Sequence, residues 1–174
     1  MRVTSRVDTF DLGSMHLQSG EGRKLALNIG IEPFILAGES YLVRPSLIPV
    51  RLDISRTTGA GYALRLRFEV TLEGPCMRCL EPAVLTLAVD VLEVSIPGET
   101  DDLDSPYVQE QILELAPWAR EAVALALPAT VRCRPDCAGL CPTCGVNLNN
   151  AESEHRHEAQ PDTRWAKLAE LHFD

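Results

Sequence analysis

Leu64-Arg-Leu-Arg-Phe-Glu-Val-Thr-Leu72 is the stretch that decides the fold, because apolar and other residues alternate strictly along it. Successive side chains of a β-strand point to opposite faces of a sheet, so this pattern places an apolar row against a core and a charged row toward solvent. Residues 46–56 alternate in the same way and lead into the turn signal Thr57-Thr-Gly-Ala-Gly61. The two runs predict adjacent strands joined as a hairpin.

A third alternating run covers residues 85–96. Its apolar residues keep one phase as far as Val91 and change phase from Leu92 onward, which predicts a β-bulge near Val91. The first 40 residues show shorter alternation, for example from Leu25 to Ile29, and we expect them to add further strands.

The period of the pattern changes after Pro97-Gly98 and an acidic linker at residues 99–104. Pro117 suits the first residue of a helix, where its missing N–H costs nothing. Trp118, Ala122 and Leu125 then fall on one helical face, and the helix is expected to end before Pro128. Asp162 is a good N-cap for a short C-terminal helix.

This order of elements predicts an α+β fold. Residues 1–98 are expected to form an antiparallel β domain, a mostly antiparallel sheet or partly open barrel that carries a Cys-x-x-Cys hairpin. Residues 99–174 are expected to supply the acidic linker, the helix, a zinc-knuckle segment and the C-terminal helix, all packed on the same core. A chain of 174 residues is long enough for one such domain with an appendage.

Composition and charge limit the possible functions. The start of the chain lacks the apolar core of a signal peptide, and no apolar run approaches the ~20 residues that span a bilayer. We therefore expect a cytoplasmic protein without membrane association. The net charge of −9 argues against a general nucleic-acid binder. Residues 41–80 are nevertheless rich in arginine, and a contact with a polyanion is expected there.

The cysteines form one isolated Cys-x-x-Cys and one dense block: Cys76, Cys79, Cys133, Cys137, Cys141 and Cys144. Disulfides are one explanation, but gaps of two and three residues and the lack of a secretory signal favour metal binding. Thiolates two residues apart, turned by a following glycine, can share one zinc at about 2.3 Å. The segment Cys141-Pro-Thr-Cys144-Gly145 has this zinc-knuckle pattern.

A knuckle supplies two of the four ligands of tetrahedral zinc. His155 and His157 would face the same side of an extended segment, so they can complete a Cys2His2 site with Cys141 and Cys144. The alternative is a solvated acidic loop that happens to hold two histidines. A Cys2His2 site would leave four thiols for a second zinc: Cys76, Cys79, Cys133 and Cys137.

A competing partition places a single zinc in the dense block alone: Cys133, Cys137, Cys141 and Cys144. Cys76 and Cys79 would then be loosely paired or free, because spacing limits reach and not connectivity. A catalytic dithiol at Cys76 needs a helix N-terminus to lower its pKa, and this motif lies between alternating segments. A hydrolytic zinc needs an open coordination position, whereas cysteine-rich ligands are typical of closed structural sites.

Four segments carry a family resemblance: Cys76-Met-Arg-Cys79-Leu80, Leu125-Ala-Leu-Pro128, Asp136-Cys137-Ala-Gly-Leu-Cys141-Pro-Thr-Cys144-Gly145-Val-Asn-Leu-Asn149, and Asp162-Thr-Arg-Trp-Ala-Lys-Leu168. In these segments the chain resembles the YceD family of bacterial large-subunit ribosomal RNA accumulation proteins. Many members carry Cys-x-Cys where this sequence has His155-Arg-His157. Shorter members keep the Cys-x-Arg-Cys hairpin and lack most of the dense block.

The resemblance implies a non-enzymatic role in ribosome biogenesis, in the accumulation or maturation of large-subunit ribosomal RNA. The implied partners are a ribosomal protein, ribosomal RNA or both, and no small-molecule substrate is expected. The cysteine spacing adds one or two structural Zn²⁺ ions as cofactors. The acidic C-terminal part would attract a basic ribosomal protein, and the arginine-bearing strands could meet RNA phosphates. Alternative functions are a zinc-dependent hydrolase and a thiol-disulfide enzyme. The sequence contains no phosphate-cradling glycine loop and no Ser/His/Asp arrangement.

Overall fold

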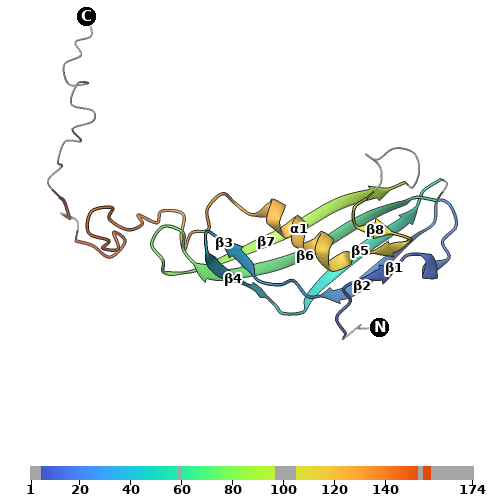
Figure 1. Cartoon of the computed structure of the whole chain (residues 1–174), viewed down its shortest axis with the longest axis horizontal. Helices are drawn as coiled ribbons and strands as arrows, with labels where there is room; N and C mark the ends of the chain where they lie inside the picture. Colours follow the sequence, from blue (N-terminus) through green and yellow to red (C-terminus); the bar gives the residue numbers. More distant parts are fainter. Residues whose placement is uncertain (1–4, 59, 97–104, 153–154, 158–174) are drawn as a thin grey trace, which may run out of the picture.

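The computed structural model of the chain describes residues 5–58, 60–96, 105–152 and 155–157. Its main feature is a long antiparallel sheet (Figure 1). Within the described residues this sheet has six strands: β2 (Gly22–Ile29), β3 (Phe34–Leu36), β4 (Glu39–Arg44), β5 (Ile48–Arg56), β6 (Tyr62–Pro75) and β7 (Pro82–Ser95). The predicted α+β class and open antiparallel sheet are confirmed at this level.

The hairpin of β6 and β7 runs the length of the sheet. On its other edge, β6 pairs first with β5 and then, around Leu72, with β4. β2 pairs with β5, and β3 pairs with β4. The peptide bond between Arg44 and Pro45, which lie between β4 and β5, is cis. The pairing of β5 with β6 confirms the hairpin that the alternating runs predicted.

The predicted β-bulge near Val91 is wrong. One register continues along the whole hairpin, from Tyr62 opposite Ser95 to Pro75 opposite Pro82. Leu92 and Val94, which suggested the change of phase, lie on the outer face of β7 and are 72% and 43% exposed. The apolar pattern changed because the outer face of this strand carries apolar residues, while the backbone keeps its regular pleat.

Helix α1 (Leu115–Ala126) packs across the inner face of the sheet (Figure 1). Pro117 is its third residue and not its first. Leu125 is 80% exposed, so its predicted place on the buried face is wrong. The buried residues follow the i, i+3, i+4, i+7, i+8 spacing of an amphipathic helix: Leu115, Trp118, Ala119, Ala122 and Val123.

A smaller three-stranded sheet contains β1 (Phe10–Asp11), β9 (Ile112–Leu113) and β8 (Val108–Gln109), in that order, and the 3-10 helix η1 (Gly13–Met15) follows β1. The strands expected in the first 40 residues are therefore present. One continuous core joins residues from both parts of the chain, including Leu12, Leu66, Trp118 and Val131. The predicted boundary after residue 98, the linker at 99–104 and the helix from Asp162 lie outside the described residues.

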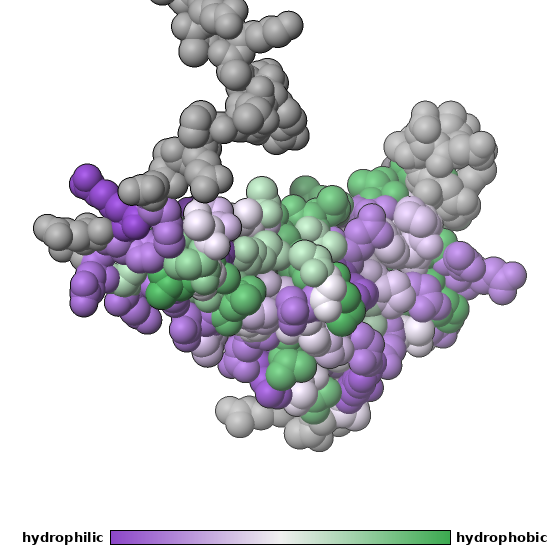
Figure 2. Space-filling model, turned by 60° about the vertical axis from the view of Figure 1, so that its left-hand side comes forward, coloured by the Kyte–Doolittle hydropathy of each residue, from purple (hydrophilic) through white to green (hydrophobic). Residues whose placement is uncertain are grey.

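The exposed apolar side chains do not form one continuous surface in the view of Figure 2, where hydrophobic patches are interspersed with hydrophilic residues. The most exposed of them are Ile35, Leu80, Val84, Leu92 and Leu125. Among the described residues, no helix has the length and apolar character that crossing a membrane requires.

Candidate metal centres

The turn between β6 and β7 folds as a knuckle around Cys76 and Cys79. The Cys76 N–H donates to the Glu81 carbonyl at 2.7 Å, and the Leu80 N–H donates to the Cys76 carbonyl at 3.0 Å. Leu80 completes the turn with a φ of 64°, in the left-handed region. Both thiols are buried, with Cys76 0% and Cys79 4% exposed. The hairpin position predicted for this motif is confirmed.

The segment from Cys141 to Gly145 has the same backbone geometry. The Cys141 N–H donates to the Val146 carbonyl at 2.8 Å, and the Gly145 N–H donates to the Cys141 carbonyl at 2.8 Å. Gly145 has a φ of 74°, so it occupies the position that Leu80 takes in the hairpin. The chain therefore contains two knuckles with the same backbone hydrogen bonds. The knuckle at Cys141 has the usual glycine at its last turn, whereas the knuckle at Cys76 has Leu80 there.

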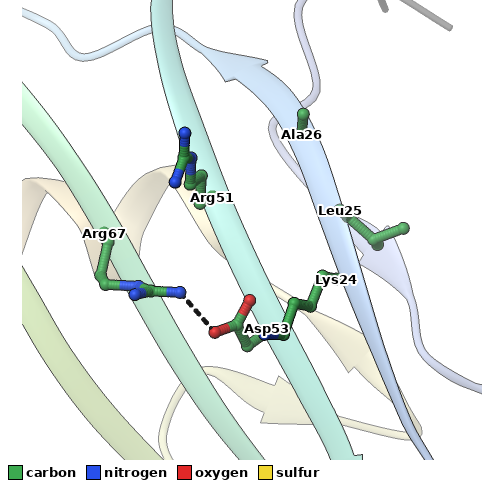
Figure 3. A pocket seen from close by; sticks show the side chains of 6 residues that line it. All are labelled: Lys24, Leu25, Ala26, Arg51, Asp53 and Arg67. Carbon is green, nitrogen blue, oxygen red and sulfur yellow. Dashed lines mark hydrogen bonds and ion pairs between the residues drawn. The ribbon is translucent and has the colours of Figure 1, made fainter.

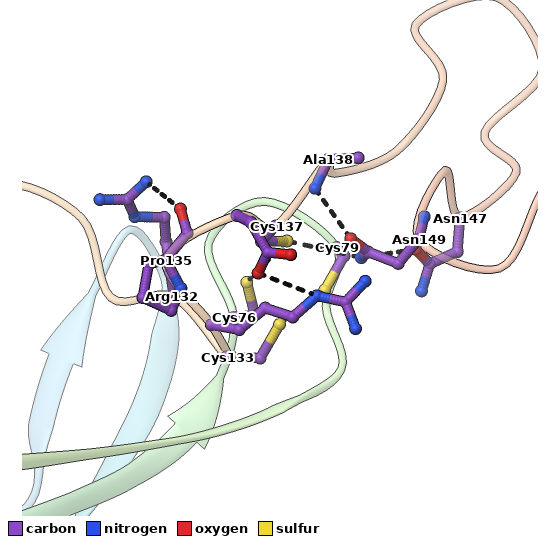
Figure 4. Close-up of polar contacts among 11 residues, drawn as sticks. Cys76, Cys79, Arg132, Cys133, Pro135, Cys137, Ala138, Asn147 and Asn149 are labelled. Carbon is purple, nitrogen blue, oxygen red and sulfur yellow. Dashed lines mark hydrogen bonds and ion pairs between the residues drawn. The ribbon is translucent and has the colours of Figure 1, made fainter.

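The hairpin knuckle forms a four-thiol cluster with Cys133 and Cys137 (Figure 4). The Cys76 and Cys137 sulfurs lie 3.8 Å apart, and those of Cys79 and Cys133 lie 3.6 Å apart. Zinc–sulfur bonds of about 2.3 Å in a tetrahedron place the sulfurs roughly 3.8 Å from one another. The spacing fits one tetrahedral zinc, and the sulfurs are too far apart to be bonded to each other.

The second knuckle forms a cluster with the two histidines. The Cys144 Sγ lies 3.5 Å from the His155 Nε2, which is 3.1 Å from the His157 Nε2. The ligand atoms of Cys141, Cys144, His155 and His157 all lie within 4.8 Å of one another. Tetrahedral zinc with the usual bond lengths places such pairs roughly 3.3–3.6 Å apart, so the donor set suits a Cys2His2 site.

The structure divides the eight candidate ligands into two groups of four. This grouping is the one that two zinc sites require. The single-site alternative would need Cys133 and Cys137 together with Cys141 and Cys144, and these residues belong to different clusters. Metal binding by each cluster stays a prediction, which the donor types and spacing support.

Hydrogen bonds attach the dense block and the residues just before it to the hairpin tip. The Met77 N–H donates to the Val131 carbonyl at 2.8 Å, and the Leu140 N–H donates to the Arg78 carbonyl at 3.1 Å. The Arg78 side chain in turn donates to the Ala138 carbonyl at 3.2 Å. Sequence reasoning counted Arg78 among the arginines of residues 41–80 that could meet a polyanion, and it did not predict this contact with the dense block.

Asn149 links the four-thiol cluster to the second knuckle segment (Figure 4). Its Nδ2 lies 3.5 Å from the Cys137 sulfur, and its Oδ1 accepts the Ala138 N–H at 2.8 Å. Asn147 Oδ1 accepts from the Asn149 backbone at 3.0 Å and from its side chain at 2.8 Å. Such outer hydrogen bonds orient metal ligands, and sequence reasoning missed both asparagines.

Hydrogen bonds favour the ionised form of one or more thiols in each cluster. Burial raises the pKa of Cys76. Hydrogen bonds from backbone N–H groups, first that of Arg78, have a larger effect in the other direction and lower this pKa to about 6. Hydrogen bonding to His155, then to the backbone of Cys144, lowers the pKa of Cys141 to about 6. Burial, then contact with Cys79, raises the pKa of Cys133 to about 12. The thiolate is the form that binds metal.

A sequence model described as "Large ribosomal RNA subunit accumulation protein YceD" matches residues 64–172, which is more than half of the chain. The chain belongs to the YceD family. The matched region begins in β6 and includes both knuckles and both clusters. The family resemblance stated from the sequence is therefore confirmed.

The YceD match is accompanied by similarity to curated proteins. An uncharacterised protein of Mycobacterium tuberculosis is 43% identical over 104 residues, covering 56% of this chain and 49% of that protein. An uncharacterised protein of Mycobacterium leprae is 37% identical over 131 residues, covering 71% of this chain and 59% of that protein. The chloroplastic "Large ribosomal RNA subunit accumulation protein YCED homolog 1" of Zea mays is 28% identical over 180 residues. The match covers 82% of this chain and 59% of the maize protein.

This YceD-family chain thus spans between about half and three fifths of the length of the curated relatives it matches. No solved structure shows a significant match to it.

Proposed function

We propose that the protein is a non-enzymatic factor in ribosome biogenesis that promotes accumulation of large-subunit ribosomal RNA by binding a ribosomal protein, ribosomal RNA or both. Membership of the YceD family carries this proposal, because the family is described by that role. The maize relative bears the same description as a chloroplast protein. Two structural zinc ions would hold the binding surface at the tip of the sheet.

The burial of the four-thiol cluster supports a structural metal. Cys76, Cys79 and Cys137 are each at most 4% exposed, so a zinc held by these thiols would be enclosed by protein. Catalytic zinc keeps one coordination position open for water or substrate, whereas four thiolates close the coordination sphere. This donor set argues against a zinc-dependent hydrolase.

The surroundings of Cys76 argue against a thiol-disulfide enzyme. Such enzymes expose the reactive thiol at a helix N-terminus. Cys76 follows β6 directly, and its sulfur is buried against that of Cys137. Cys76 is 0% exposed, so a disulfide substrate has no access to its thiol in this fold.

The zinc content of the intact protein tests the metal assignment. We expect two zinc ions per chain by elemental analysis. The double variant Cys76→Ser/Cys79→Ser should retain one, and Cys141→Ser/Cys144→Ser should also retain one, because the ligand sets share no residue. Wild-type protein with a single zinc that survives the first double variant would overturn the two-site assignment.

Recovery of ribosomal components tests the binding function. The tagged 174-residue chain is incubated with bacterial lysate, with and without ribonuclease, and the bound RNA and proteins are identified. We expect enrichment of large-subunit ribosomal RNA, a large-subunit protein or both over a tag-only control. A ribosomal protein that stays bound after ribonuclease treatment contacts the chain directly, whereas one that is lost was held through RNA. If neither sample contains a large-subunit component, the proposed function is wrong.

A further inference from the structure

The outer face of the sheet, opposite α1, carries a hollow lined by three cationic side chains (Figure 3). Lys24 comes from β2, Arg51 from β5 and Arg67 from β6, so three neighbouring strands contribute. Asp53 is the one acidic residue in the lining, and the hollow has a volume of about 400 Å³. The lining therefore has two more positive charges than negative ones.

Two of these cations lie side by side. Arg51 and Arg67 are directly opposite each other in the pairing of β5 with β6. Like charges at directly opposed positions repel each other and destabilise a sheet unless an anion compensates. Asp53 compensates only one of them, since its Oδ2 lies 2.6 Å from Arg67 Nη2. Across the described residues, Arg51 and Lys24 have no ion pair.

The guanidinium of Arg67 also keeps unused donors. Its Nε is buried and has no hydrogen-bond acceptor among the described residues. Buried donors nearly always have a partner. The planar fork of an arginine can bind two oxygens of one phosphate, so a modest movement of Arg67 toward an anion in the hollow would satisfy more donors than Asp53 alone does.

Other arginines on this outer face are already neutralised. Arg65 makes a two-pronged contact with Asp90, at 2.7 and 2.6 Å. Arg44 is paired with Glu73 at 3.3 Å. Among the described residues of this outer face, the cations without an ion pair are therefore Lys24 and Arg51, both in the hollow. The chain as a whole has a net charge of −9.

We propose that this hollow binds phosphate groups, and that these belong to the backbone of an RNA chain. The proposal rests on the proposed function, because it identifies the surface on which the RNA would lie. The three cations span two strand spacings, about 10 Å, which is wider than a single phosphate needs. That width favours a chain of phosphodiesters over one free phosphate ion.

The test measures binding of a fluorescent single-stranded RNA oligonucleotide to the full chain at several salt concentrations. Lys24→Gln and Arg51→Gln each remove one positive charge from the hollow. Arg23→Gln is the matched control, because Arg23 precedes Lys24 on β2 and lies on the other face of the sheet. Thermal unfolding of each variant verifies the fold, and Arg51→Gln should be at least as stable as wild type because it removes the repulsion from Arg67.

We expect each hollow variant to bind the RNA roughly tenfold more weakly, the cost of one charge-assisted hydrogen bond. The slope of log K against log salt should become shallower by about 0.7 for each lost phosphate contact. Arg23→Gln should bind like wild type. If Lys24→Gln and Arg51→Gln weaken binding no more than Arg23→Gln does, the proposal is overturned.

Competition separates the two sources of phosphate. Inorganic phosphate should displace the RNA no better than chloride does at the same ionic strength. A parallel titration with chloride provides this comparison. Displacement at micromolar phosphate would overturn the RNA assignment. If the wild-type chain fails to bind the oligonucleotide but still captures a large-subunit protein after ribonuclease treatment, the hollow proposal fails while the proposed function stands.

Discussion

At the scale of single residues, the two knuckles differ in how their last turn is made. Leu80 and Gly145 both have positive φ, at 64° and 74°. A side chain in this conformation brings its Cβ close to the following carbonyl, so a leucine there is strained whereas a glycine is not. Leu80 is also 64% exposed, so little packing compensates the strain.

Exchanging the residue type at this turn should lower the zinc affinity in the second knuckle only. In Gly145→Ala a new Cβ would meet no other atom within 4 Å, so the change adds backbone strain alone. We expect the zinc affinity of the second site to fall about fivefold, equivalent to ~1 kcal/mol of strain. Leu80→Gly should leave the affinity of the first site unchanged or slightly higher. Titration against a chromophoric chelator measures both; equal affinity of Gly145→Ala and wild type would contradict this account.

Asn149 offers a test of the outer hydrogen bonds around the four-thiol cluster. Asn149→Ala removes the contacts to the Cys137 sulfur and to the Ala138 N–H. We expect the zinc affinity of this cluster to fall about 10- to 100-fold, as is typical when such a partner is lost. The neighbouring exposed Asn150 provides the control Asn150→Ala, which should bind zinc like wild type. Equal loss in both variants would show that the effect is not specific to Asn149.

Sequence alone identified the candidate ligands but not how they are grouped. Cysteine spacing marks residues that can share a metal locally, as Cys141 and Cys144 do. It does not tell which of the distant thiols join Cys76 and Cys79, because this depends on the hydrogen bonds between Met77 and Val131 that bring the segments together. Asparagine is common in turns, so the role of Asn149 had no distinctive signal.

At the scale of elements, strands were predicted well where one face is buried and the other polar. In β6 the alternation from Leu64 to Leu72 agrees with its burial pattern. The errors occurred where an apolar residue faces solvent, at Leu92 in β7 and at Leu125 in α1. A hydrophobic pattern predicts a core face only if the opposite face is polar, and exposed apolar residues are common in folded proteins.

The hairpin of β6 and β7 is supported from β4 by a buried tyrosine. Tyr41 is 1% exposed, and its hydroxyl donates to the Pro75 carbonyl at 2.7 Å, one residue before Cys76. Its ring lies against Gly74, where the Cβ of any other residue would collide with ring atoms. The absence of a side chain at Gly74 therefore allows the contact that positions the first knuckle.

Gly74→Ala should consequently disturb both the hairpin and the metal cluster. We expect the free energy of unfolding to fall by about 1–3 kcal/mol, the usual cost of overpacking, since the Tyr41 ring must move. Denaturant unfolding of the zinc-loaded protein measures the effect. Tyr41→Phe serves for comparison, because it removes only the hydroxyl hydrogen bond, worth about 1 kcal/mol. A Gly74→Ala protein more stable than Tyr41→Phe would contradict the packing account.

At the scale of the whole molecule, the cluster segments extend from one end of an independently packed sheet (Figure 1). Most of the buried apolar side chains belong to the strands and α1. Between residues 131 and 157, the buried residues among those described are Val131, Cys137, Gly139 and Cys141. A segment with so little apolar burial needs another source of free energy to fold, and metal binding can supply it.

Removal of the metal should therefore loosen one part of the molecule and leave the other folded. After chelation, we expect trypsin to cut first at Arg132, while Arg65 and Arg67 in the centre of the sheet stay protected. Far-UV circular dichroism should keep its β-sheet signal, and added zinc should restore protection. Cleavage sites are identified by mass spectrometry, and zinc loss is verified by elemental analysis. Unchanged cleavage at Arg132 in verified metal-free protein, or simultaneous loss of protection at Arg65, would show that zinc does not hold this segment on an independently stable sheet.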